Sequence, residues 1–150
     1  MADSDDVLLL RPLTAGSGFT VRSSHRPQPG APAPDRFVSA TIWSFPPGAP
    51  DGIALIRDGL LPVLHETGPA PLAALTTETA HNTFARLPVR TGENVAAVFT
   101  SYPDERARRR HLAEIQDHPR AREILTGVRR EQTAVPRTLR LTPTSRSLTP

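Results

Sequence analysis

Three side chains that could take part in proton transfer follow the second predicted strand. Glu78, His81 and Asn82 bring a carboxylate, an imidazole and an amide into one short stretch. Imidazole is the usual general acid or base near neutral pH, and its neighbours could orient a small ligand. Glu78 and Asn82 could equally bond the backbone of the connection that follows. Because His81 has no evident structural duty, we predict it as the catalytic residue and the other two as substrate-binding residues.

Two aromatic residues could form the wall of a pocket. Trp43 and Tyr102 lie in segments that we expect to be strands, and each combines a large apolar ring with one polar hydrogen-bonding group. Both could also be ordinary core residues. We predict both as substrate-binding residues.

Two further histidines bear on metal binding. His111 and His118 would share one face of an unbroken helix, but Pro119 argues that the helix is interrupted. No third ligand stands at metal spacing, so we expect no metal site. We retain His111 as a predicted substrate-binding residue, because a perturbed imidazole in a pocket would favour an enzyme.

The basic residues are all arginine. Arg106, Arg109 and Arg110 stack at helical spacing, with Glu105 and Glu114 interleaved among them. This pattern is typical of a solvated, salt-bridged helix face, and an anion or nucleic-acid patch is the alternative. Aromatic residues are too few and scattered for base stacking, so we expect no nucleic-acid partner.

Several other classes are disfavoured by what the sequence lacks. The chain has no cysteine, which excludes disulfides and thiolate chemistry. No glycine-rich phosphate loop follows a strand, no Ser-His-Asp set stands in a recognisable context, and we expect no cofactor. The start, MADSDDVLLLRPL, is acidic and its apolar run is short, so we expect a cytoplasmic protein without a membrane partner.

The pattern of elements predicts one α+β domain. Its 150 residues suffice for one core, and its 17 prolines concentrate in residues 26–36 and 45–52. We therefore divide the chain into an N-terminal strand with a proline-rich linker (1–36) and a folded domain (37–150). The domain is expected to contain strands at 37–45, 71–79, 94–102 and 137–143, and helices at 51–68 and from 103, the latter restarting after Pro119. Pro62 should kink the first helix and Asp104 should cap the second.

This β-α-β-β-α-β order is that of a ferredoxin-like sandwich with two helices on one face of the sheet. Trp43 and Tyr102 would then lie on neighbouring strands. The other face also carries apolar residues and needs a cover, commonly a second sheet in a dimeric α/β barrel. We therefore expect a homodimer.

Two stretches of the chain have the pattern of the same structural unit's end, because VLLLRPLTAGS (7–17) and TLRLTPTSRSL (138–148) share an apolar run, an arginine, a proline and a small polar tail. We expect residues 7–12 to add a strand, either swapped into a partner or laid on an edge of their own sheet.

A resemblance to the NIPSNAP family, within the dimeric α/β-barrel superfamily, rests on the stretch TETAHNTFARLPVRTGENV. The residues that carry it are Thr77, Glu78, Asn82, Phe84, Leu87, Pro88, Val89, Arg90, Gly92, Glu93 and Val95. The resemblance implies that the chain corresponds to the C-terminal repeat of two-repeat members. It could be a half that dimerises with itself, a half that pairs with a separate first-repeat chain, or the product of a misplaced start codon.

Two functions follow from this resemblance. The superfamily implies a protein that binds a small hydrophobic ligand, such as a cofactor-free tailoring enzyme of the monooxygenase, isomerase or cyclase type. The alternative is a non-catalytic binding or assembly module, or half of a split protein. Ala96 and Val98 replace the bulky aromatics expected in the third strand, and Thr91 replaces an expected glutamate. The space left in the strand could form a ligand pocket or receive a neighbouring chain.

Overall fold

The fold is described by a computed structural model, which places residues 7–21, 27–84 and 86–147. The strands are β1 (Leu10–Pro12), β2 (Phe37–Ser44), β3 (Ala73–Thr77), β4 (Val95–Tyr102) and β5 (Arg137–Leu141). The helical segments are α1 (Asp51–Ala54), η1 (Leu55–Leu60), α2 (Leu61–Thr67), α3 (Glu105–Asp117) and α4 (Pro119–Glu131). Each predicted element of residues 37–150 is present, with ends that differ by a few residues.

The strands form one antiparallel sheet in the order β1-β3-β4-β2-β5. Without β1, this is the strand order of a ferredoxin-like domain, so the predicted α+β fold class is confirmed. β2 and β4 are neighbours over their whole length, from Phe37 opposite Tyr102 to Ser44 opposite Val95. Trp43 and Tyr102 therefore lie on adjacent strands, as predicted.

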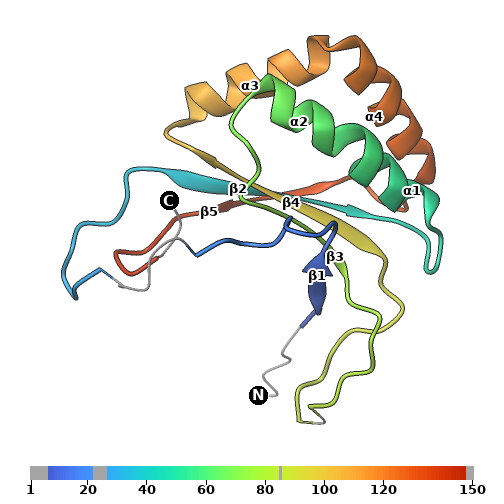
Figure 1. Cartoon of the computed structure of the whole chain (residues 1–150), viewed down its shortest axis with the longest axis horizontal. Coiled ribbons are helices and arrows are strands. Elements are labelled where there is room, and N and C mark those ends of the chain that lie inside the picture. Colours follow the sequence, from blue (N-terminus) through green and yellow to red (C-terminus); the bar gives the residue numbers. More distant parts are fainter. Residues whose placement is uncertain (1–6, 22–26, 85, 148–150) are drawn as a thin grey trace.

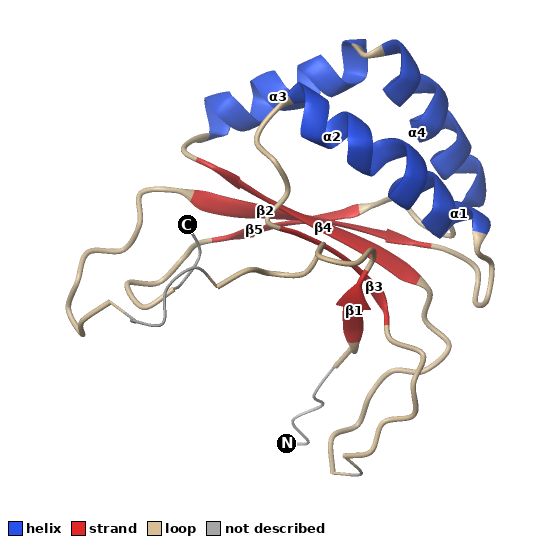
Figure 2. Cartoon of the chain, in the orientation of Figure 1, coloured by secondary structure: helices blue, strands red, loops and turns tan. Residues whose placement is uncertain are grey.

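All the helices lie on one side of the sheet, as Figure 1 and Figure 2 show. The long connections hang from the opposite side, including the one between β3 and β4. The described part of the chain thus has a covered face, where sheet and helices enclose a core, and a far face where the placed residues form loops and no helix.

Local chemistry explains where the helices begin and end. The Asp104 carboxylate accepts a hydrogen bond from the backbone N–H of Ala107 at 2.7 Å, so the predicted cap of α3 is confirmed. The predicted break falls at His118, whose extended backbone separates α3 from α4 and whose ring caps α4. Pro62 is the second residue of α2, which follows the π-helical segment η1, and the N–H of Leu61 between them bonds to the carbonyl of Ile56. In place of a sharp kink at Pro62, the helix has a wider π-helical turn before the proline and continues without a break from α1 through η1 to α2.

The core lies between the covered face and the helices. It contains Trp43 and Phe45 from the sheet side and Ile56, Val63 and Val128 from the helices, all nearly inaccessible to solvent. Burial of such side chains is the main favourable contribution to folding, at about 25 cal/mol for each Å² of apolar surface.

The far face is partly covered by the chain's own N-terminal segment. Phe19 packs edge to face on Phe99 of β4, with ring centroids 5.0 Å apart. Ala40 and Ala97 point away from the helices, yet each is only 1 % exposed. Apolar side chains remain exposed toward β5, where Leu139 and Leu141 are 38 % and 42 % accessible. This sheet face is therefore less open than the sequence suggests.

β1 lies on the outer edge of β3, with Leu10 opposite Thr77 and Pro12 opposite Leu75. Of the two predicted routes for residues 7–12, the structure shows pairing with the chain's own sheet. β1 thus joins residues of the N-terminal segment to the same sheet as the folded domain.

Candidate ligand cavity

A cavity of about 230 Å³ lies between the covered face of the sheet and the helices. Its floor comes from alternate residues of β2 and β4, and its roof from η1, α2, α3 and α4. The lining residues are Ser39, Thr41, Trp43, Leu60, Leu64, Val98, Thr100, Tyr102, Arg108, Leu112, Ile115, Gln116, Leu125 and Thr138. The walls are mostly apolar with a few hydroxyl groups, which is the usual composition of a small-molecule site.

The two-residue repeat of a strand explains why hydroxyl groups gather on the floor. Ser39 and Thr41 precede Trp43 at alternate positions of β2, while Thr100 precedes Tyr102 in the same way on β4. Val98, one of the two small residues noted in this strand, lines the cavity, whereas Ala96 is packed in the core.

Tyr102 connects the cavity to a buried histidine. Its hydroxyl lies 2.7 Å from Nδ1 of His111, and Nε2 of the same ring lies 3.2 Å from the hydroxyl of Thr67. His111 is 3 % exposed and does not line the cavity itself. A ligand in the cavity would therefore meet Tyr102, with His111 behind it.

The Thr67 hydroxyl determines where the histidine carries its hydrogen. It donates its one hydrogen to the carbonyl of Val63 at 2.9 Å, so it accepts from Nε2–H of His111. Nδ1 is consequently unprotonated and accepts from the hydroxyl of Tyr102. The three side chains form a directed chain of hydrogen bonds that begins at the cavity wall.

Burial keeps both members of the pair neutral. It lowers the pKa of His111 below its usual 6.5, although nearby Glu114 acts in the opposite direction. Burial also raises the pKa of the Tyr102 phenol above its usual 10.0, against a smaller opposing contribution from Thr100. At neutral pH the pair is a phenol hydrogen-bonded to an imidazole that can accept a proton.

The other predicted site residues lie elsewhere. His81 is exposed in the connection between β3 and β4, and neither it, Glu78 nor Asn82 lines the cavity. In Figure 1 this connection extends away from the helices. The structure thus brings together Trp43, Tyr102 and His111 but not the set centred on His81, whose catalytic role stays a prediction.

Glu78 and Asn82 make the backbone contacts that were the structural alternative. The Glu78 carboxylate accepts from the N–H of Ala80 at 2.8 Å. The Asn82 amide accepts from the N–H of Phe84 at 2.9 Å and donates to the carbonyl of Leu87 at 2.9 Å. These bonds hold the shape of the connection.

Sequence reasoning missed Thr67 and Arg108 as parts of the site. The alternating hydroxyl residues of β2 and β4 carried a usable signal, because polar residues on the covered face of a sheet need a reason to be there. Nothing in the local sequence marks Thr67, since its role depends on the approach of α2 to α3.

A second, larger cleft of about 570 Å³ lies beside the N-terminal segment, lined by residues 14–21, Leu61, His65 and residues 70–74. It has no pair of titratable side chains in contact, so we place the candidate site in the smaller cavity. No group of three or more potential metal ligands occurs among the placed residues. None of the helices in that part of the chain has the length and apolar character needed to cross a bilayer.

A scan against protein-family models finds no match, and neither does a search of curated proteins. Solved structures do match. A NIPSNAP family protein from Agrobacterium tumefaciens strain C58 has a TM-score of 0.61 at 11% identity, covering 83% of this chain and 98% of that chain. A second NIPSNAP family protein of unknown function from the same strain has a TM-score of 0.57 at 13% identity, covering 79% and 94%.

A NIPSNAP-like domain protein from Burkholderia xenovorans has a TM-score of 0.53 at 20% identity, covering 76% of this chain and 90% of that chain. At these identities the likeness concerns the backbone arrangement, which extends over nearly the whole length of each solved chain. The protein therefore has a NIPSNAP-like fold.

Proposed function

We propose that the chain binds a small hydrophobic metabolite in the cavity and transfers a proton to and from it without a bound cofactor. The observation that carries this proposal is the hydrogen bond from Tyr102, on the cavity wall, to the unprotonated Nδ1 of the buried His111. A buried imidazole in its base form, reached through a phenol, is suited to general base catalysis.

The proton balance of the step is simple. An acidic O–H or C–H of the ligand gives its proton to the Tyr102 oxygen while the phenolic proton moves to Nδ1 of His111. This leaves a ligand anion and an imidazolium whose Nε2–H still donates to Thr67. Return of the proton to another ligand atom completes an isomerisation or a cyclisation with no net oxidation. A monooxygenase reaction would need dioxygen as a further reactant.

The apolar walls support the choice of ligand. Trp43, Leu64 and Ile115 offer flat or branched apolar surfaces, which favour a ring or a short branched chain over a strongly polar compound. A polar group on the ligand would be met by the hydroxyls on the floor of the cavity.

The chain's single tryptophan makes the proposal testable, because Trp43 lines the cavity and gives one indole N–H resonance. Small one-ring and two-ring compounds with an acidic C–H should shift this resonance on binding. Bound compounds should exchange that hydrogen for deuterium in D₂O faster with the native chain than with Tyr102→Phe. Binding without faster exchange would support the non-catalytic module, and compounds that bind without moving the Trp43 signal would place the site elsewhere.

We also propose that the chain forms a homodimer through the far face of the sheet, next to β5. Leu139 and Leu141 expose apolar surface there, and β5 is an edge strand of the sheet. A second copy related by a two-fold axis would cover both leucines with the same residues of its partner, which is the commonest form of oligomer.

A further inference from the structure

The wall of the cavity contains a charged, partly exposed group that the proposed proton transfer does not use. Arg108 is the one charged residue among those lining the cavity in the described part of the chain. Its guanidinium donates to the Glu105 carboxylate at 2.9 Å, which is its one hydrogen bond to a side chain among the placed residues. A guanidinium has five N–H donors, so most of its hydrogen-bonding capacity remains for something else.

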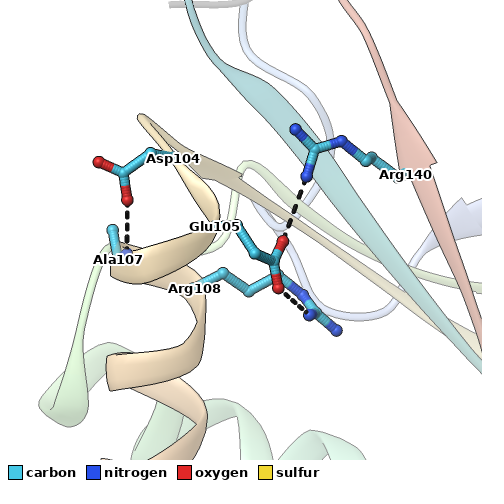
Figure 3. Close-up of polar contacts among 5 residues, drawn as sticks. All are labelled: Asp104, Glu105, Ala107, Arg108 and Arg140. Atoms are coloured by element: carbon cyan, nitrogen blue, oxygen red, sulfur yellow. Dashed lines mark hydrogen bonds and ion pairs between the residues drawn. The ribbon is translucent and has the colours of Figure 1, made fainter.

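Glu105 holds a second arginine as well. Its other carboxylate oxygen lies 3.2 Å from Arg140 of β5, so Glu105 stands between the two arginines, as Figure 3 shows. The Arg140 guanidinium also stacks over the Phe37 ring, 3.7 Å from its centroid. If a ligand displaced Glu105 from Arg108, Glu105 would still be paired with Arg140.

The ion pair between Glu105 and Arg108 is weak enough for the acid group of a ligand to displace Glu105. The two side chains are 39 % and 25 % exposed, and partly exposed ion pairs are weakened by solvent. A planar carboxylate can bind a guanidinium through two parallel hydrogen bonds, a stronger arrangement than the single bond that Glu105 makes here.

Resting on the proposed function, we propose that the ligand is a compact aromatic or alicyclic anion whose acid group binds Arg108 in the place of Glu105. Its ring would lie against the apolar wall formed by Trp43 and Leu64. A dry cavity of about 150 Å³ holds benzene. The 230 Å³ available here suits one substituted ring or a fused pair. Glu105 then acts as a displaceable counter-ion that holds Arg108 in place until the ligand binds.

The test compares 2-naphthoate with the neutral 2-naphthamide, following the Trp43 indole resonance of the full chain by titration. We expect naphthoate to bind the native chain at least tenfold more tightly. Arg108→Gln should remove this preference by weakening naphthoate alone. Glu105→Gln should strengthen naphthoate about fivefold, because its competitor has lost its charge, and leave naphthamide unchanged. Arg109→Gln, one residue further along α3 and exposed, is the matched control and should change neither affinity.

The outcomes separate this inference from the proposed function. If both compounds bind equally and Arg108→Gln affects neither, the anion preference is wrong while the cavity remains a binding site. If Glu105→Gln weakens naphthoate, Glu105 supports the ligand instead of competing with it, and the displacement is wrong. If neither compound moves the Trp43 resonance, the cavity does not bind such ring compounds, and both the proposed site and this inference are wrong.

Discussion

The hydroxyl of Tyr102 lies 2.7 Å from Nδ1 of His111, across the boundary between the sheet and helix α3. The two residues are nine positions apart in the chain, Tyr102 at the end of β4 and His111 in α3, the helix that Asp104 caps. The contact serves packing and chemistry together, because it satisfies a buried nitrogen and places an imidazole in its base form behind a residue of the cavity wall.

Replacing Tyr102 with phenylalanine should lower the free energy of unfolding by about 1–3 kcal/mol, because Nδ1 of His111 loses its donor while it remains buried. Urea denaturation measures this change. Thr41→Val is the matched control, since Thr41 also lines the cavity but its side-chain hydroxyl makes no hydrogen bond with the placed residues, and it should cost less than about 1 kcal/mol. Equal effects of the two substitutions would contradict the role of the Tyr102 contact.

The stability of the chain should fall in mildly acidic solution because of His111. Its pKa is lowered in the folded state, so below its unfolded value of about 6.5 the unfolded chain binds more protons. The contribution of His111 to the free energy of unfolding is therefore constant above about pH 6.5. It is lost as the pH falls from about 6.5 through the lowered pKa of the folded chain. Tyr102 and Thr67 are hydrogen-bonded to the His111 ring, and the negative charge of Glu114 opposes the lowering of its pKa.

The measurement is the melting temperature of the native chain and of His111→Gln between pH 7.5 and 5. The native chain should lose more stability over this range than the variant, because the two chains share every other ionisable group. Parallel curves would show that His111 is not the group responsible.

Placing a side chain at Gly68 should disturb the same contact. A Cβ at this position would collide with the ring of His111, although the extended backbone there suits any residue. Gly68→Ala should therefore destabilise the chain by about 1–3 kcal/mol through overpacking and should slow proton transfer to bound ligands. Gly127→Ala, where the nearest atom is the mobile end of Leu55, should be neutral or stabilising. A Gly68→Ala chain as stable as the Gly127→Ala chain would contradict the close approach.

Removing residues 1–12 should lower the melting temperature, because β1 covers the edge of β3. Beyond the strand itself, the carbonyl of Leu9 accepts from the N–H of Glu78 at 2.8 Å, and that of Val7 accepts from Arg90 at 2.9 Å. These bonds anchor the connection between β3 and β4, so it should also become more accessible to proteases. An unchanged melting temperature would show that β1 contributes nothing to stability.

The proposed homodimer predicts that Leu139→Lys combined with Leu141→Lys weakens self-association at least tenfold in sedimentation equilibrium. Both side chains are already exposed in the single chain, so its own stability should change little. Val135→Lys, at a position that is 83 % exposed, is the control and should not affect association. An intact chain that is a monodisperse monomer at micromolar concentration would rule the homodimer out.

Local patterns in the sequence determined the elements of this fold and their order. Alternation in residues 37–45 predicted β2, helical spacing after Asp51 predicted the first helix, and Asp104 and Pro119 marked the start of α3 and its separation from α4. These signals suffice because strand and helix periods and helix caps depend on neighbours within a few residues. The ferredoxin-like strand order followed from the sequence of elements, since few topologies accommodate it.

The tertiary structure decided which of the candidate residues meet. His81 stood beside Glu78 and Asn82 in the sequence, yet that connection extends away from the helices, whereas His111 and Thr67, 44 positions apart, are brought together by the packing of α2 against α3. Helix packing also set the burial that lowers the pKa of His111 and the space in front of Tyr102. Such properties depend on distances between elements, and no periodicity along the chain records those distances.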